Sequence, residues 1–117
     1  MDISIDATSG VPPYEQLRAQ VAAQASSGAL PAGTRLPTVR ALATDLGLAA
    51  NTVARAYKEL EADGVVVTEG RRGTFVGSEP LTDGFDDTVL TAYVAAARRA
   101  GLTLPEATGL VERAWPR

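Results

Sequence analysis

The sequence has no cysteine and no histidine, and these two absences remove several kinds of site at once. Without cysteine, the chain forms no disulfide and offers no thiolate to a metal ion. Without histidine, it lacks the commonest general base and the commonest metal ligand of proteins. We also find no nucleophile paired with a base and no glycine-rich phosphate loop. We therefore expect no catalytic residues, no metal site and no cofactor.

Long apolar runs and a targeting segment are missing as well. No stretch of the 117 residues approaches the ~20 apolar residues that cross a bilayer. Residues 1–6 lack the basic start and the apolar centre of a signal peptide. We therefore expect no membrane partner and a cytoplasmic location. The length allows one compact domain and a small appendage.

Positive charge is scarce overall but unevenly distributed. The net charge is −3, which by itself does not indicate nucleic-acid binding. Residues 35–76 nevertheless carry six cations against five acids, whereas residues 1–34 and 77–117 are both net acidic. Ten of the eleven cations are arginine, whose planar guanidinium suits bidentate contacts with phosphate or guanine. The middle of the chain is therefore the candidate nucleic-acid surface, with flanks that limit unspecific binding.

Residues 1–77 are predicted to form three helices followed by a β-hairpin. Apolar residues recur at helical spacing in three stretches, which are bounded by prolines, a threonine cap or glycines. Two runs of β-forming residues follow, joined by a glycine-bounded tip. An alternation around Ile3 and Ile5 also suggests a short strand. The predicted elements are helices at about 12–27, 38–47 and 49–62, strands at 65–68 and 74–76, and a tip at 69–73.

The second and third predicted helices are joined by a tight turn, residues 45–48, as a helix-turn-helix requires. When Val53 is placed at the centre of the buried face, a rotation of about 100° per residue gathers polar side chains on the opposite face. A helix with such a face fits the major groove of B-DNA. The polar set is Asn51, Thr52, Arg55, Lys58 and Glu59.

The polar side chains of the third helix and of the hairpin tip suit DNA chemically. Asn51 and Arg55 are of types that read adenine and guanine, whereas Thr52 and Lys58 suit phosphate better. The two arginines of the tip, Arg71 and Arg72, suit the backbone or the minor groove.

Each of these side chains also has a plainer interpretation. Arg55 and Lys58 can pair with Glu59 or Glu61 on an exposed face, and Asn51 can cap the third helix. The hairpin arginines can belong to an ordinary charged turn. Two neighbouring acids, Asp86 and Asp87, stand near the start of a later predicted helix, where they can interact favourably with the helix dipole rather than form a carboxylate site.

Several segments resemble the GntR family of winged-helix repressors. Residues 30–43 (LPAGTRLPTVRALA) look like its opening signature, and residues 51–61 (NTVARAYKELE) look like its recognition helix. Residues 72–76 (RGTFV) are similar to its wing, and residues 13–17 (PYEQL) match the start of its first helix. The resemblance covers about residues 10–77 and implies an α+β fold, a winged helix-turn-helix.

The resemblance also implies which residues bind DNA. Ala49 and Ala50 depart from the family pattern, since they stand where polar or basic residues are common and offer no side-chain hydrogen bond. The implied contacts come from Arg40 in the second helix, from Asn51, Thr52 and Arg55 in the third, and from Arg71, Arg72 and Gly73 in the wing.

The remainder of the chain is predicted to be a linker, residues 78–83, and a two-helix segment, residues 84–117. Residues 103–106 match a helix capping box. The short pair resembles the YtrA-type subfamily, in which a helical pair mediates dimerisation. Its apolar stripes have too little core within one copy to cover them, so we expect a homodimer and a palindromic operator. The predicted interface residues are Val89, Tyr93, Leu110 and Trp115.

The sequence thus predicts a DNA-binding transcriptional regulator, and the resemblance favours repression. The competing prediction is a winged-helix module that binds another protein and no DNA. Such a module has no need of arginines at positions 40, 55 and 72 on one surface. The sequence also leaves open whether a small-molecule effector binds, because the dimer can enclose an apolar cleft near Tyr93 and Trp115.

Overall fold

The computed structural model of the chain describes residues 1–77 and 87–117. They form two compact units, the N-terminal unit (residues 1–77) and the C-terminal unit (residues 87–117). The predicted linker, residues 78–83, and the first residues of the predicted C-terminal segment, 84–86, lie outside the described residues.

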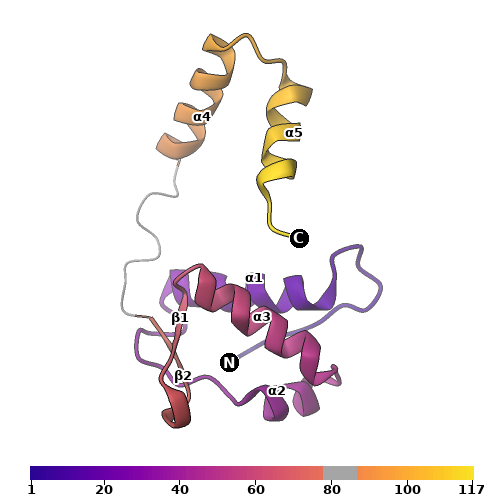
Figure 1. Cartoon of the computed structure of the whole chain (residues 1–117), viewed down its shortest axis with the longest axis vertical. Helices are drawn as coiled ribbons and strands as arrows, with labels where there is room; N and C mark the ends of the chain where they lie inside the picture. The colour runs from indigo at the N-terminus through magenta and orange to yellow at the C-terminus, as the bar shows by residue number, and fades with distance from the viewer. Residues whose placement is uncertain (78–86) are drawn as a thin grey trace. The chain divides into compact units, whose positions relative to one another are not determined.

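The N-terminal unit contains three helices and a two-stranded antiparallel sheet, in the predicted order (Figure 1). The strands pair with Val67 opposite Phe75, and a 3-10 turn, η1 (Gly70–Arg72), forms the hairpin tip. The predicted α+β winged helix-turn-helix is therefore confirmed. Its elements are α1 (Pro13–Ser27), α2 (Val39–Leu46), α3 (Ala50–Ala62), β1 (Val66–Thr68) and β2 (Thr74–Val76).

The ends of the helices follow local sequence signals. Pro12 and Pro13 open α1, where the missing N–H of proline costs no helical hydrogen bond. The Thr38 hydroxyl accepts a hydrogen bond from the Ala41 N–H at 3.1 Å and so caps α2. Gly47 ends α2 in the left-handed region with φ 66°, which allows the sharp turn into α3. Ala49 precedes α3 and supplies no side-chain cap.

One apolar core joins the three helices to the hairpin. The Tyr57 hydroxyl, at the edge of this core, donates a hydrogen bond to the Pro37 carbonyl oxygen at 2.8 Å and ties α3 to the segment before α2. The predicted placement of Val53 on the buried face of α3 is confirmed, since Val53 is fully buried. The buried residues are Leu17, Val21, Leu30, Leu36, Leu42, Ala43, Val53, Ala56, Tyr57, Leu60, Val65, Val66 and Val76.

Residues 34–36, between α1 and α2, add a short edge to the hairpin. The Leu36 N–H donates to the Thr74 oxygen at 2.8 Å, and the Val76 N–H donates to the Thr34 oxygen at 2.8 Å. Arg35 and Phe75 form an antiparallel bridge between these bonds. The wing is thus attached to the helices by backbone hydrogen bonds as well as by the core.

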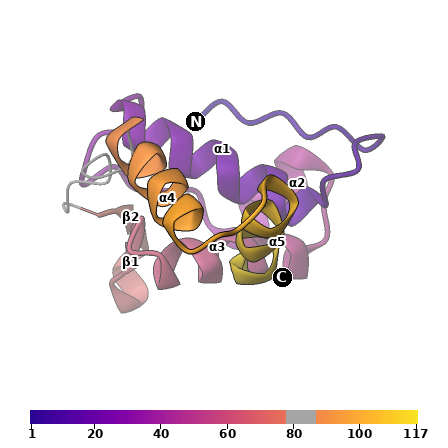
Figure 2. The same cartoon turned by 90° about the horizontal axis from the view of Figure 1, so that it is seen from above.

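The N-terminal segment runs extended along α1 and is not a strand (Figure 2). Gln20 bonds both backbone groups of Ser4, at 3.0 and 2.7 Å, and the Gln16 side-chain oxygen accepts from the Asp6 N–H at 2.8 Å. Ile3 and Ile5 pack against the core. The strand suggested by their alternation was wrong, because amide side chains of α1 rather than a neighbouring strand bind this backbone.

The C-terminal unit is a helical hairpin of α4 (Asp87–Arg99) and α5 (Leu104–Ala114). Thr103 and Glu106 form the predicted capping box, and the Tyr93 hydroxyl joins the helices by donating to the Ala107 oxygen at 2.7 Å. Among the described residues of this unit, only Ala97 is buried. None of the helices in the described part of the chain has the length and apolar character that a bilayer crossing needs.

Because of Tyr57, the stability of the N-terminal unit is expected to fall at alkaline pH. Burial raises the pKa of the Tyr57 phenol from 10.0 to about 12. Above pH ~10 the unfolded chain loses this proton while the folded chain keeps it, so stability falls as the pH rises toward 12. We expect the thermal midpoint, followed by circular dichroism, to drop over this interval.

The variant Tyr57→Phe isolates this contribution. At neutral pH it loses the hydrogen bond to Pro37, at a cost of about 1 kcal/mol in the free energy of unfolding. Above pH ~10 its midpoint should fall less steeply than that of the wild type. An equally steep fall in both proteins would show that Tyr57 is not the group responsible.

Candidate nucleic-acid interface

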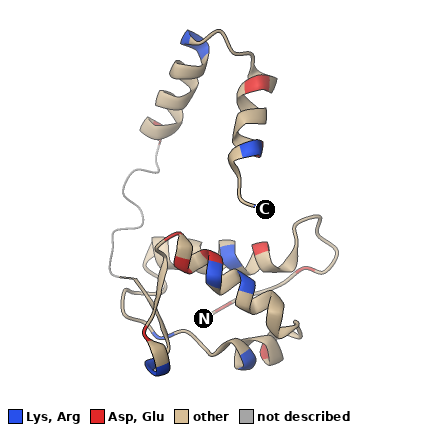
Figure 3. Ribbon diagram, viewed as in Figure 1, with Lys and Arg blue, Asp and Glu red and all other residues tan. Residues whose placement is uncertain are grey.

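The structure places the predicted DNA-binding residues on three elements of the N-terminal unit. Lysine and arginine residues lie on α2, on α3 and at the hairpin tip (Figure 3). Thr52 and Gly73 are half-buried, and the other predicted contact residues are exposed. The exposed set is Arg40, Asn51, Arg55, Lys58, Arg71 and Arg72.

The plainer interpretations of the α3 side chains are not what the structure shows. Neither Arg55 nor Lys58 forms a salt bridge within the described part of the chain. Asn51 is the second residue of α3 and does not cap it, since the cap position is Ala49. The polar groups on the outer face of α3 therefore form no ion pair with residues 1–77 or 87–117.

Arg55 is held by an aromatic side chain that the sequence did not single out. Its guanidinium carbon lies 3.7 Å from the centroid of the Tyr14 ring. Tyr14 stands in the first turn of α1 and is half-buried against the core. The donors of a guanidinium lie in its plane, so a ring beneath one face leaves those donors available.

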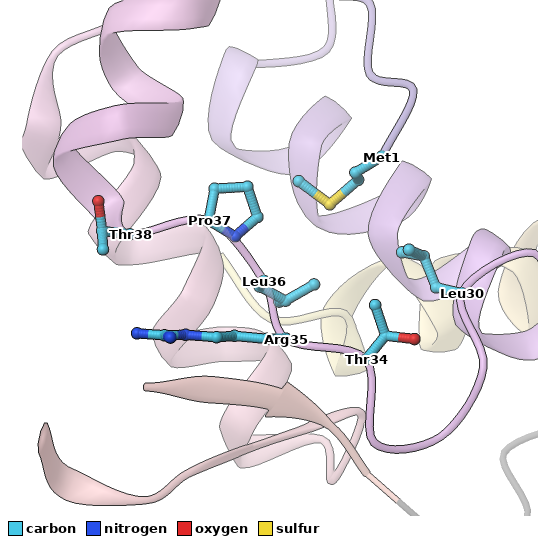
Figure 4. Close-up of a pocket in the computed structure, with 7 residues that line it drawn as sticks. All are labelled: Met1, Leu30, Thr34, Arg35, Leu36, Pro37 and Thr38. Carbon is cyan, nitrogen blue, oxygen red and sulfur yellow. The ribbon is translucent and has the colours of Figure 1, made fainter. Parts of the chain in front are cut away.

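Arg35 is a second residue that the sequence did not place in the site. Its side chain extends away from Met1 and Leu30 and runs alongside the hairpin (Figure 4). At Gly73, where φ is +117°, a Cβ atom would lie 2.8 Å from the Arg35 Nε. Glycine at position 73 therefore allows the close approach of this arginine to the wing.

A shallow pocket of about 450 Å³ opens beside Arg35. The rest of its wall is largely apolar and includes two core residues, so it offers no cluster of polar groups to a ligand. Its other lining residues are Met1, Leu30, Thr34, Leu36, Pro37 and Thr38.

The hairpin tip keeps its cations accessible. Arg72 lies 3.6 Å from a Glu69 carboxylate oxygen, but its side chain is 80% exposed. An ion pair this exposed contributes little and is easily exchanged for another anion. Arg71 beside it is exposed as well.

The predicted interface residues of the C-terminal unit lie on both of its helices. Tyr93, Leu110 and Trp115 line an apolar pocket of about 440 Å³. Val89 lies one helical turn before Tyr93 on α4 and is 42% exposed. No three acidic, cysteine or histidine side chains within residues 1–77 and 87–117 come together as metal ligands.

Comparisons with known proteins agree with this architecture. Residues 13–76 match the GntR family of bacterial regulatory proteins. The HTH-type transcriptional regulator Rv1152 of Mycobacterium tuberculosis is 50% identical over 105 residues, which cover 90% of this chain and 87% of that protein. The HTH-type transcriptional repressor YtrA of Bacillus subtilis is 41% identical over 80 residues, or 68% of this chain and 62% of the relative.

A solved structure extends the likeness to nearly the whole chain. YtrA from Sulfolobus acidocaldarius, a GntR-family transcription factor, superimposes with a TM-score of 0.61 at 28% identity. The match covers 95% of this chain and 94% of that one.

The contact between Arg35 and Gly73 predicts a stability effect at the wing. In Gly73→Ala, the new methyl group meets the Arg35 guanidinium and the backbone keeps a φ that side chains rarely adopt. We expect a loss of about 1–3 kcal/mol in the free energy of unfolding, measured by denaturant titration.

Two further variants check the cause. Gly10→Ala serves as control, because Gly10 has no positive φ and nothing within 4 Å of its Cβ position, so it should be nearly neutral. Adding Arg35→Ala to Gly73→Ala should recover the steric part of the loss and leave the backbone part. Strict additivity of the two substitutions would show that the whole loss comes from the backbone at position 73, and a Gly73→Ala variant as stable as the control would contradict the prediction.

Proposed function

Because the chain belongs to the GntR family of bacterial regulatory proteins, we propose that it is a sequence-specific DNA-binding regulator that represses transcription by occupying a palindromic operator as a homodimer. The observation that carries the proposal is the exposed polar face of α3, flanked by cations on α2 and on the wing. A relative that carries the name repressor supports the proposed direction of control. The chain has no catalytic role in this proposal, and it acts in the cytoplasm, where the operator lies.

In this proposal α3 lies in the major groove. Asn51, near its N-terminus, contacts a base edge, as residues at this end of a recognition helix do. Arg55, one turn later, reads guanine through its in-plane donors. Thr52 and Lys58 bind phosphates on either side.

The start of α3 offers a phosphate a further contact. Ala49 leaves this end without a side-chain cap, so backbone N–H groups stay open to an anion. Phosphate contacts of this kind fix the register of a protein on the duplex without carrying sequence information. They compensate here for the side-chain contacts that Ala49 and Ala50 do not provide.

The remaining cations hold the backbone on both sides of this groove. Arg40 reaches a phosphate from the first turn of α2. Arg71 and Arg72 reach the backbone or the minor groove from the hairpin tip. Arg35 lies against Gly73, beside the tip.

A second copy of the chain completes the proposed regulator. One N-terminal unit carries few cations for a chain of net charge −3, so a single copy binds DNA weakly. The C-terminal unit exposes large apolar side chains, including Leu110 at 40% and Trp115 at 53%. Among the described residues of this two-helix unit, only Ala97 is buried, so one copy has almost no core of its own. Pairing with a second copy would supply that core.

Two-fold symmetry then sets the form of the operator. Two α3 helices related by a dyad read inverted half-sites on one side of the duplex.

The apolar pocket beside Tyr93 and Trp115 is where a small apolar effector would bind. A thermal-shift screen of metabolites against the dimer tests for such an effector.

Affinity for DNA separates base reading from phosphate binding. The probe is a duplex that the full chain selects from a randomised pool, compared with a scrambled duplex over a salt series. Arg55→Ala should cost about 1–3 kcal/mol on the selected duplex and much less on the scrambled one. Arg72→Ala should weaken both duplexes similarly and flatten the salt dependence by about one unit of slope per lost phosphate contact.

Arg99→Ala, at the end of α4, removes the same charge outside the proposed interface and should change neither affinity. Equal losses on both duplexes for Arg55→Ala would mean that Arg55 does not read sequence. If no sequence is selected and no substitution matters, the DNA-binding proposal fails and the protein-interaction module takes its place.

The dimer proposal is tested by sedimentation at micromolar concentration. The wild type should have about twice the chain mass of 12.1 kDa. Leu110→Glu places a charge in the proposed apolar interface and should give the monomer. Thr108→Glu adds the same charge to another side of α5 and should leave the dimer intact. A wild type that sediments as a monomer would contradict the proposal.

A further inference from the structure

The stack of Arg55 on Tyr14 connects the outer face of α3 to the first turn of α1. The two residues lie 41 positions apart in the sequence, and the guanidinium carbon is 3.7 Å from the ring centroid. That distance is well inside the range of about 6 Å over which a cation is attracted to an aromatic face. Arg55 has no carboxylate partner in the described part of the chain, so the ring is the group that holds it.

Tyr14 is itself held firmly enough to act as a support. Pro12 precedes α1 and Pro13 begins it, which restricts the backbone on the N-terminal side of Tyr14. The ring packs partly against the core that joins α1 to α3. The support is therefore a rigid element rather than another mobile surface side chain.

The stack changes what Arg55 offers to DNA. A free arginine side chain loses rotamer entropy when it makes a fixed contact. An arginine that already lies flat on a ring has lost part of that freedom before binding. Its guanidinium plane is also fixed, and a bidentate contact with guanine depends on the direction of that plane.

We propose that Tyr14 is a positioning residue for the DNA contact of Arg55, so that α1 contributes to sequence discrimination without touching a base. This inference rests on the proposed function. It assigns to the ring, and not to the Tyr14 hydroxyl, the task of orienting the guanidinium.

A double-mutant cycle on the full chain tests the proposal, with the selected and scrambled duplexes as probes. Tyr14→Leu should weaken binding to the selected duplex about two- to fivefold, because the released guanidinium must then lose its rotamer freedom on binding, and should affect the scrambled duplex less. In an Arg55→Ala background the same substitution should have no effect on DNA affinity. Tyr14→Phe keeps the ring and should bind as the wild type does.

The outcomes separate the positioning role from a structural role. An equal loss from Tyr14→Leu with and without Arg55 would show that Tyr14 only supports the fold, and would overturn the inference. A loss from Tyr14→Phe as large as that from Tyr14→Leu, or a gain of affinity in Tyr14→Leu, would overturn it too. If Arg55→Ala alone has no effect, the proposed role of Arg55 fails instead.

A measurement without DNA keeps the test decisive if Tyr14→Leu does not fold. Nuclear magnetic resonance of the wild type should show the Arg55 side-chain protons shifted upfield by the ring, and the shift should persist in Tyr14→Phe. It should vanish in Tyr14→Met, which keeps an unbranched apolar side chain on α1. Unshifted Arg55 protons in the wild type would contradict the stack directly.

Discussion

Five consecutive residues, 34–38, contact the hairpin, α2, α3 and the apolar core of the N-terminal unit. Backbone bonds attach residues 34 and 36 to β2, and Arg35 lies against Gly73 at the wing. Leu36 is buried in the core. The Pro37 carbonyl oxygen accepts a hydrogen bond from the Tyr57 hydroxyl of α3, and the Thr38 hydroxyl caps α2. Because one short, extended segment makes all of these contacts, it sets the spacing between the wing and the helix-turn-helix. The proposed DNA-binding surface depends on that spacing.

Local signals allowed much of the fold to be predicted. Thr38 and Gly47 mark the ends of α2 because a cap and a left-handed turn are decided by neighbouring residues. The burial of Val53 follows from helical periodicity. The alternation at Ile3 and Ile5 led to the wrong prediction of a strand. A period of two residues shows which side chains face inward, but it does not show which groups bind the backbone. There, Gln16 and Gln20 of α1 take the place of a neighbouring strand.

The side-chain contacts within the candidate site could not be predicted from the sequence, for a different reason. Arg35 meets Gly73, and Tyr14 meets Arg55, across 38 and 41 positions of the chain. Both pairs depend on how α1, α3 and the hairpin pack, and no periodicity or motif encodes a side-chain contact of that kind. Motif and charge sufficed to name the cations of α2, α3 and the wing, but not to show which neighbours orient them.

The central claim is that α2, α3 and the wing meet DNA together. Amide chemical shifts of the full chain, followed while the selected duplex is added, test this most directly. The account predicts large changes at Arg40, at Asn51 and around Gly73, with the buried amides of α1 little affected. Changes confined to the C-terminal unit, or none at saturating duplex, would contradict it.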